Sequence, residues 1–257
     1  MNYIVLDLEF NQSFPFKTGK KVEPNPECPF EIIQIGAVKL NDAFEQVDTF
    51  DYMIRPQIYP RLHPFVEKIT GIHPEQLQDK PTFQEAYTAF LEFIGNEPAV
   101  LCTWGGDDVK SLYRNIYFYD LDADVMTDQF LNVQPFASAY LNYEAGKAIG
   151  LKNAVVELGI PENGSYHNAL NDAVYTANIF RIVHPDVIKA ETFQPLTMLA
   201  KKPKRLRTNV KSLLMYVEEK LERELTEDEK GLVKMAYMLG RNHTFDSSPV
   251  LKKKEKK

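Results

Sequence analysis

Apolar residues fill the beginning of the chain, and charge interrupts them at only two positions. Residues 1–10 read MNYIVLDLEF, with Asp7 and Glu9 inside the apolar run. Alternate side chains of a strand point the same way, so a strand here would present both carboxylates on one face. Two neighbouring acids on an otherwise buried strand repel each other and lose hydration, a cost that a divalent cation between them would offset. The alternative is an edge strand whose polar face lies in water, because acid-x-acid is a short and common pattern.

The apolar segments that follow predict further strands. Residues 11–30 are rich in Pro, Lys and Asn and indicate a long loop. Residues 32–40 predict a second, buried strand and residues 49–54 a third, which together with the first favour an antiparallel meander. Residues 55–64 read as loop. A short strand is predicted over residues 99–104.

Apolar positions spaced three and four residues apart predict helices in the same part of the chain. A capping box begins the first at Thr82, and the apolar period continues to about residue 95. The second runs from Asp107 to Tyr119 and begins with two acids, which capping and the helix dipole would explain without any further role. Two more helices are predicted over residues 151–159 and 166–180.

The helix predicted over residues 166–180 carries an acid in an unusual place. Asp172 stands beside the small residue Ala173, where a carboxylate near packed surface needs a partner. His167 precedes Asp172 by five residues, so the pattern places an imidazole at the entry of the helix. Capping or core packing would explain an isolated histidine equally well.

The pattern changes after about residue 190. We predict one domain over residues 1–190, a basic linker over 191–208 and a helical hairpin within 209–245, with helices over 209–221 and 226–239. The lysine-rich residues 246–257 indicate a disordered, solubilising tail. The hairpin either braces the preceding domain or, through its basic entry segment, holds a phosphate backbone.

Composition narrows the class of protein. The 257 residues are 44% apolar, which suits one sizeable domain with an appendage. Cys28 and Cys102 are too few for a disulfide framework or a zinc cluster, so a reducing compartment fits best. The N-terminus lacks a signal-peptide pattern, and no apolar run approaches the length of a membrane span. We therefore expect a soluble, cytoplasmic protein.

Charge is unevenly distributed along the chain. A formal net charge of -6 would argue against a nucleic-acid partner if the charges were evenly spread. Basic residues instead gather in one stretch without acids, and distribution matters more than the total. This basic stretch consists of Lys201, Lys202, Lys204, Arg205, Arg207 and Lys211.

The acidic positions and the histidine together form a sequence of three motifs. In these motifs the chain resembles the DEDDh branch of the 3′–5′ exonuclease superfamily over roughly residues 1–185. The most specific part is HNALND at 167–172, and EIIQIGAV at 31–38, ITGI at 69–72 and LKNA at 151–154 support it. The TWGGDD form of the second motif and the long insert after the first strand are most similar to the enhanced-RNAi-type, KapD-like branch, which trims RNA 3′ ends.

This resemblance implies a fold and a site. The fold is α/β and ribonuclease-H-like, a mixed central sheet flanked by helices. Alignment through Trp104 and Gly105 makes Asp108, rather than Asp107, the acid of the second motif. The implied catalytic residues are Asp7, Glu9, Asp108, His167 and Asp172, of which the four acids would hold two Mg²⁺ ions, with Mn²⁺ as a substitute. The implied substrate contacts are Leu8, Phe10, Thr70, Gly71 and Trp104.

The chemistry of these side chains is consistent with that family. Carboxylates are the hard oxygen ligands that Mg²⁺ and Mn²⁺ prefer. An imidazole side chain, whose ordinary pKa is about 6.5, can take a proton from water near neutral pH, and such a role would suit a histidine at position 167. We expect hydrolysis of the terminal phosphodiester at 3′ ends of single-stranded RNA or DNA, with release of nucleoside 5′-monophosphates.

Two other functions stay open at this point. A binding protein that does not cleave should have lost one or more ligands, and this chain keeps every carboxylate and the histidine. A phosphohydrolase acting on small nucleotides would not need the basic stretch or the long polar loop.

Overall fold

The computed structural model describes residues 1–14, 23–144, 146–185, 188–194, 199 and 210–241. The chain divides into two compact units, Met1–Ala200 and Lys201–Lys257, and each is described by itself. Of the linker predicted over residues 191–208, positions 195–198 and 200–208 lie outside the described residues, as does the lysine-rich tail. The finer division into a domain, a linker, a hairpin and a tail stays a prediction.

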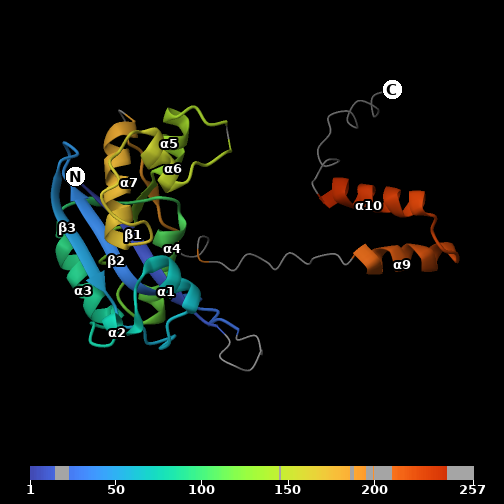
Figure 1. The fold of residues 1–257 in the computed structure, drawn as a ribbon, viewed down its shortest axis with the longest axis horizontal. Helices are drawn as coiled ribbons and strands as arrows, with labels where there is room; N and C mark the ends of the chain where they lie inside the picture. The colour runs from blue at the N-terminus through green and yellow to red at the C-terminus, as the bar shows by residue number, and fades with distance from the viewer. Residues whose placement is uncertain (15–22, 145, 186–187, 195–198, 200–209, 242–257) are drawn as a thin grey trace. The chain divides into compact units, whose positions relative to one another are not determined.

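A mixed sheet of six strands forms the centre of the described part of the first unit (Figure 1). Strands β1, β2 and β3 form an antiparallel meander, β4 and β5 run parallel to β1, and β6 is antiparallel to β5. The α/β fold with a mixed central sheet is thereby confirmed. In their order across the sheet the strands are β3 (Gln46–Met53), β2 (Phe30–Leu40), β1 (Asn2–Gln12), β4 (Ala99–Thr103), β5 (Gln129–Asn132) and β6 (Glu191–Thr192).

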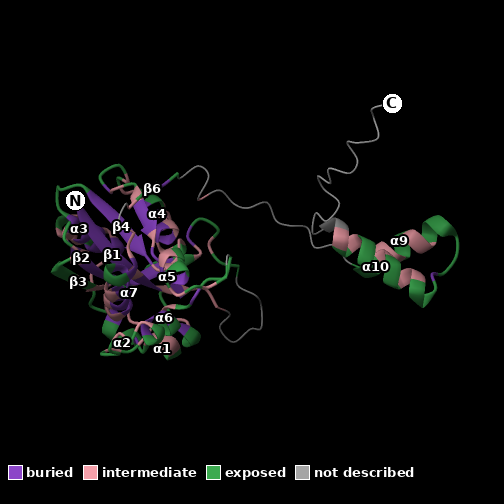
Figure 2. Cartoon of the chain, turned by 90° about the horizontal axis from the view of Figure 1, so that it is seen from above, coloured by how far each residue is buried: buried purple, intermediate pink, exposed green. Residues whose placement is uncertain are grey.

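Helices cover both faces of this sheet, and β1, β2 and β4 are buried over most of their length (Figure 2). One hydrophobic core contains Leu6 and Leu8 of β1 and includes α3 (Phe83–Ile94) and α4 (Asp107–Phe118). The core on the other face contains Val5. Its helices are α5 (Gln134–Tyr140), α6 (Leu151–Glu157) and α7 (Ala169–Val183).

The alternation along β1 decides where its acids point. Tyr3 and Val5 belong to the core on the α7 side, whereas Leu6 and Leu8 belong to the opposite core. Asp7 and Glu9 share the parity of Val5, and side chains two residues apart on a strand share a face. Both carboxylates therefore project from the side of the sheet that α7 covers.

The first turn of α7 lies unusually close to β2. Gly36 pairs with Asp7 across the two strands, and a Cβ on Gly36 would lie 2.1 Å from the backbone of Ala169 and Leu170. Gln34, which pairs with Glu9, is fully buried and accepts a hydrogen bond of 3.2 Å from the Ala169 N–H. The positions opposite the two acids on β2 thus fix the beginning of α7 beside them.

The start of α7 differs from the prediction. The helix begins at Ala169 rather than at residue 166, because Asn168 is its N-cap and accepts a hydrogen bond from the Asn171 N–H (3.2 Å). His167 precedes the cap with a φ of 61°, in the left-handed region. The histidine therefore stands outside the helix, and the helix extends to Val183 instead of ending at residue 180.

Two short helices that the sequence pattern did not predict follow β3 and the loop expected over residues 55–64. They are α1 (Pro64–Thr70) and α2 (Pro74–Leu77), and both have a proline in the first turn. Val66 and Leu77 pack on Ile33 of β2, where the register of β1 and β2 shifts. Proline suits the first turn of a helix, but segments of seven and four residues are too short for a recognisable period.

Two buried polar side chains anchor the segment before α1. The Asn11 amide donates to the carbonyls of residues 59 and 61 at 2.7 and 3.0 Å, and its carbonyl accepts from the His63 N–H at 2.9 Å. The Glu31 carboxylate accepts from the backbone N–H groups of residues 57–59. Because Asn11 has the parity of Asp7 and Glu9, it holds this segment on the face that carries the acids.

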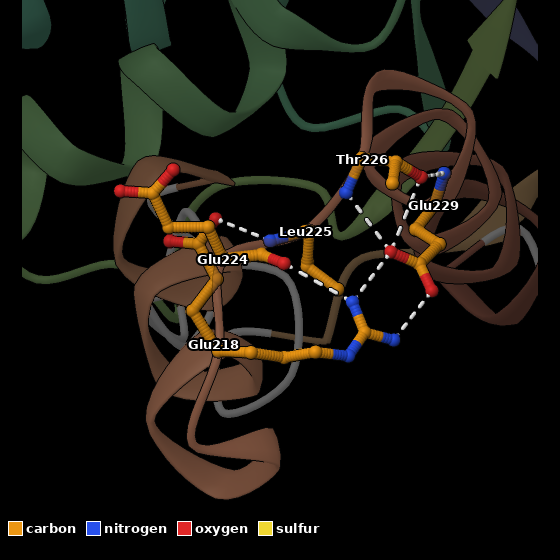
Figure 3. Close-up of polar contacts among 6 residues, drawn as sticks. Glu218, Glu224, Leu225, Thr226 and Glu229 are labelled. Atoms are coloured by element: carbon orange, nitrogen blue, oxygen red, sulfur yellow. Dashed lines mark hydrogen bonds and ion pairs between the residues drawn. The ribbon is translucent and has the colours of Figure 1, made fainter.

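The second unit contains the predicted helical hairpin. Its helices are α9 (Val210–Leu221) and α10 (Glu227–Arg241), and Figure 3 shows the turn between them. Glu229 accepts two hydrogen bonds from the Arg223 guanidinium, at 2.7 and 2.9 Å, and one from the Thr226 N–H at 2.9 Å. The Thr226 hydroxyl in turn accepts a hydrogen bond of 3.3 Å from the Glu229 N–H, which completes a capping box at the start of α10. None of the helices in the described parts of the chain is both long and apolar enough to cross a membrane.

Gly36→Ala tests the contact between β2 and α7. Because the added methyl group would meet backbone rather than a flexible side chain, we expect the free energy of unfolding to fall by about 1–3 kcal/mol. Gly150→Ala is the control, since a Cβ there meets nothing within 4 Å. Urea denaturation of the three proteins measures the difference, and equal stability of the two variants would contradict the close contact.

Candidate metal and catalytic site

The two acids of β1 occupy an interior position in the fold. β1 pairs with β2 on one side and with β4 on the other, so the alternative of an edge strand with its polar face in water is wrong. Glu9 is only 8% exposed. Burial, followed by the charges of Asp172 and Asp108, raises the pKa of Glu9 to about 8. Burial, and then Asp108, Asp172 and Glu9, also raise the pKa of Asp7 well above its ordinary value.

The turn between β4 and α4 separates the two neighbouring acids of the second motif. Gly105 has a φ of 100°, and its N–H donates to the Asn132 side chain of β5 at 2.9 Å. Asp107, the first residue of α4, has a side chain that is 98% exposed and forms an ion pair with Lys110 at 3.1 Å. Asp108 instead turns toward the carboxylates of β1. Its pKa is raised to about 7, first by burial and then by Asp107 and Asp172.

Asp172 completes the group of acids from the first turn of α7. Its side chain is 7% exposed, and its Oδ2 accepts a hydrogen bond of 2.9 Å from the His167 N–H. Its other oxygen, Oδ1, is buried and has no hydrogen-bond donor among the described residues. Burial raises the pKa of Asp172, although the His167 N–H and the His167 side chain act in the opposite direction.

His167 lies at the exposed margin of these acids. Ligand atoms of Glu9, His167 and Asp172 lie within 4.8 Å of one another, and the histidine is the exposed member of the three. The loop before it is held to α7, because the Asn171 amide donates to the Ser165 carbonyl (3.0 Å). The structure thus brings together all five residues that the sequence proposed as catalytic.

The arrangement suits a divalent cation. Burial first, and then repulsion by neighbouring carboxylates, raises the pKa of Asp7, Glu9 and Asp108. The unpartnered Oδ1 of Asp172 offers a lone pair where a ligand would lie. Hard oxygen donors of this kind prefer Mg²⁺ or Mn²⁺ to softer metals.

The five predicted substrate contacts differ in solvent exposure and in the hydrogen bonds that they already form. Leu8 is 4% exposed in the core opposite the acids, and Phe10 is half-buried beside that core. The Thr70 hydroxyl donates to the carbonyl four residues earlier and accepts from the N–H two residues later. Gly71 caps α1 with a φ of 70°. Trp104 is half-buried, and its indole N–H has no acceptor among the described residues.

The sequence interpretation missed the residues that support the site from β2 and β5. Gly36 and Gln34 were read only as part of a buried strand, and Asn132 was not considered. A glycine inside a strand is a known signal of close backbone approach, and Gln34 is a polar residue in an apolar run. Asn132 had no comparable signal, because its role depends on the neighbouring strand.

Comparison with known proteins agrees with this geometry. The exonuclease family model (RNase_T) matches residues 4–180, more than half of the chain. A probable 3′-5′ exonuclease, KapD of Bacillus subtilis, is 26% identical over 196 residues, which cover 76% of this chain and 90% of KapD. ERI1 exoribonuclease 3 of Homo sapiens is 24% identical over 206 residues, covering 75% of this chain and 57% of that protein.

A solved structure supports the fold. The nuclease domain of 3′hExo, described as a DEDDh family member bound to rAMP, superposes with a TM-score of 0.63 at 22% identity. The match covers 75% of this chain and 97% of that domain. With its motifs in the DEDDh order, its mixed sheet and its match over residues 4–180, the chain belongs to the exonuclease family, as a 3′–5′ exonuclease of the DEDDh type.

Proposed function

We propose that this exonuclease hydrolyses the terminal phosphodiester at the 3′ end of single-stranded RNA or DNA and releases nucleoside 5′-monophosphates. The observation that carries the proposal is the convergence of the buried Glu9 and Asp172 with the half-buried Asp7 and Asp108, four acids that repel one another, with His167 at their exposed margin. The names of KapD and ERI1 exoribonuclease 3 support the direction of cleavage and the nucleic-acid class. No observation on this chain favours a non-cleaving binder or a small-nucleotide hydrolase.

The four carboxylates would hold two Mg²⁺ ions, and Mn²⁺ would serve as a substitute. Bound ions of this kind stabilise charge on the phosphodiester oxygens and lower the pKa of water. The protein contributes the positions of the oxygens: β1 fixes Asp7 and Glu9, while the first turns of α4 and α7 fix Asp108 and Asp172. The Asp172 carboxylate is oriented by the His167 N–H, which occupies Oδ2 and leaves Oδ1 for a ligand.

His167 would act as the general base. Its exposed ring lies near the oxygens of Glu9 and Asp172, where it can accept a proton from the attacking water and pass that proton to solvent. Leu8 through its backbone, with Phe10, Thr70, Gly71 and Trp104, would contact the terminal nucleotide. The two buried, unpaired thiols Cys28 and Cys102 support our proposal of a cytoplasmic location.

Incubation of single-stranded oligonucleotides with Mg²⁺ tests the function directly. A 5′-labelled strand should give a descending ladder, a 3′-labelled strand should release labelled mononucleotide at once, and a chelator should stop both. A mobility shift without cleavage would indicate a binding protein. No effect on either strand would leave a small-nucleotide hydrolase as the better interpretation.

Removal of any one acid should abolish cleavage. Mutating a residue that only supports a metal ligand typically lowers metal affinity or activity about 10- to 100-fold. Removing a ligand itself should cost more, so we expect kcat/KM to fall by more than about 100-fold in each of four variants: Asp7→Ala, Glu9→Ala, Asp108→Ala and Asp172→Ala. The variants should stay folded, because each loss relieves carboxylate repulsion. Asp107→Ala is the matched control and should be nearly unaffected, since its side chain lies in solvent. An inactive Asp107→Ala beside an active Asp108→Ala would overturn the assignment.

Loss of the imidazole should slow the chemical step. We expect His167→Ala to reduce kcat by roughly 10²- to 10⁴-fold, as for a general base, with the affinity for an oligonucleotide little changed. Stopped-time assays of turnover and anisotropy measurements of binding separate the two quantities. Normal turnover of His167→Ala at neutral pH would remove the histidine from the mechanism.

The stability of the metal-free protein should fall as pH rises. The folded-state pKa of Glu9, about 8, and that of Asp108, about 7, exceed ordinary values near 4, so the folded chain binds more protons than the unfolded chain between those limits. These groups therefore lower the free energy of unfolding as pH rises from about 4 to 8. Mg²⁺ should restore stability most at pH 8, where protons compete least.

Thermal unfolding in EDTA at pH 5.5 and pH 8.0 measures this effect. Glu9→Gln should show a smaller loss between the two pH values than the unmodified protein, because one of the titrating groups is gone. An equal or larger loss in Glu9→Gln would contradict the raised pKa of Glu9.

A further inference from the structure

We propose that three aromatic side chains beyond the catalytic acids form a platform that stacks the bases of nucleotides upstream of the 3′ end. These residues, Phe14, His63 and Phe65, are called the aromatic strip. The inference rests on the proposed function, because it extends the path of the same single strand.

The aromatic strip is tied through His63 to the face of β1 that carries the acids. Asn11 has the same parity as Asp7 and Glu9, and its side chain accepts a hydrogen bond from the His63 N–H. Phe14 follows Glu9 by five residues, which places the two at most about 17 Å apart along an extended backbone. A strand whose terminal phosphodiester lies at the acids would reach the strip within a few nucleotides.

Helix α1 connects the strip to the proposed contacts of the terminal nucleotide. Phe65 lies in the first turn of α1, while Thr70 and Gly71 lie at its end, about 10 Å away for a helix of seven residues. Val66 is buried against Ile33 and holds α1 on the sheet, whereas Phe65 is 58% exposed. The helix therefore presents its aromatic residue to solvent along the same path.

The rings of the strip are held in place before any ligand binds. The centroids of Phe14 and His63 lie 4.8 Å apart, and those of His63 and Phe65 lie 6.4 Å apart with planes at 88°. His63 is the N-cap of α1, and its Nδ1 accepts a hydrogen bond of 3.0 Å from the Phe65 N–H. Fixed rings lose little conformational entropy on binding, so most of the stacking energy would appear as affinity.

The surroundings of the strip suit a phosphate backbone. A cavity of about 250 Å³ adjoins Phe14, and its walls include Ile58 and Arg61. Arg61, which lines this cavity together with Phe14, is exposed, and so is Lys68, which follows Phe65 by three residues on α1. Stacking surfaces next to cations are the general means of holding single-stranded nucleic acid without sequence preference. A protein partner would be expected to need a continuous apolar patch instead of separate rings among charges.

Binding of a fluorescein-labelled octadeoxythymidylate in EDTA, followed by anisotropy, tests the proposal without cleavage. Phe65→Ala should weaken binding by roughly 5- to 150-fold, the range that one lost base–aromatic stack corresponds to. Binding of a labelled dinucleotide, which is too short to reach the strip, should be unchanged. Tyr140→Ala is the matched control, because Tyr140 is an equally exposed aromatic residue (56%) on α5.

Oligonucleotides with a single abasic position locate the stacked bases. In the unmodified protein, an abasic site at one of the second to fifth positions from the 3′ end should weaken binding of the octamer as much as Phe65→Ala does. In Phe65→Ala, the same abasic site should weaken binding no further. Additive losses, or an octamer that binds Phe65→Ala as tightly as the unmodified protein, would overturn the proposal and favour a protein ligand for the exposed rings. Failure of the proposed function is distinct, because it would appear as absent cleavage in Mg²⁺ whatever the anisotropy shows.

Discussion

Repulsion among four carboxylates in one poorly hydrated space is the constraint on which the rest of the site depends. Isolated acids would avoid such a place, since burial and like charges both favour their neutral forms. Here the packing of the fold imposes the arrangement. β1 cannot turn its acids toward bulk water, because it is an interior strand with hydrophobic cores on both faces. The stability of that packing sustains the unfavourable charge distribution, which a divalent cation would relieve.

The approach of α7 to β2 brings the last acid into this space. Gly36 stands opposite Asp7 and removes the side chain that would hold the helix away, and Gln34 stands opposite Glu9 and accepts from the first N–H of α7. The Gln34 amide in turn donates to the Asp51 carboxylate of β3 at 2.7 Å. The position of Asp172 is therefore determined by three strands of the sheet, although Asp172 itself lies on a helix. A site built in this way is rigid, and rigidity preserves the separation of like charges that binding requires.

Local patterns in the sequence predicted what depends on local structure. The parity of Asp7 and Glu9 follows from the period of a strand, and the helix at Thr82 follows from its capping box, so both were predictable. The separation of Asp107 from Asp108 was predictable only through family resemblance, because either acid could have capped α4. The beginning of α7 was misplaced, because the apolar period continues through residues that a left-handed His167 excludes from the helix. β5 and α5 were not predicted, since four and seven residues give too little period and Asn132 acquires its role only from the adjacent turn.

The backbone conformation of His167 lets the site combine buried carboxylates, which would bind cations, with an exposed imidazole, which would accept a proton. Cation ligands act best away from water, whereas a group that accepts a proton from water and returns it to solvent must stay accessible. A histidine inside the first turn of α7 would follow the helix into the packed surface that buries Asp172. The left-handed conformation turns the chain just before the cap, so the ring stays exposed while its own N–H reaches the buried carboxylate. Such a conformation costs a non-glycine residue about 1–2 kcal/mol, and glycine would adopt it freely but would supply no imidazole. The strain at this one residue is therefore consistent with a chemical requirement for its side chain.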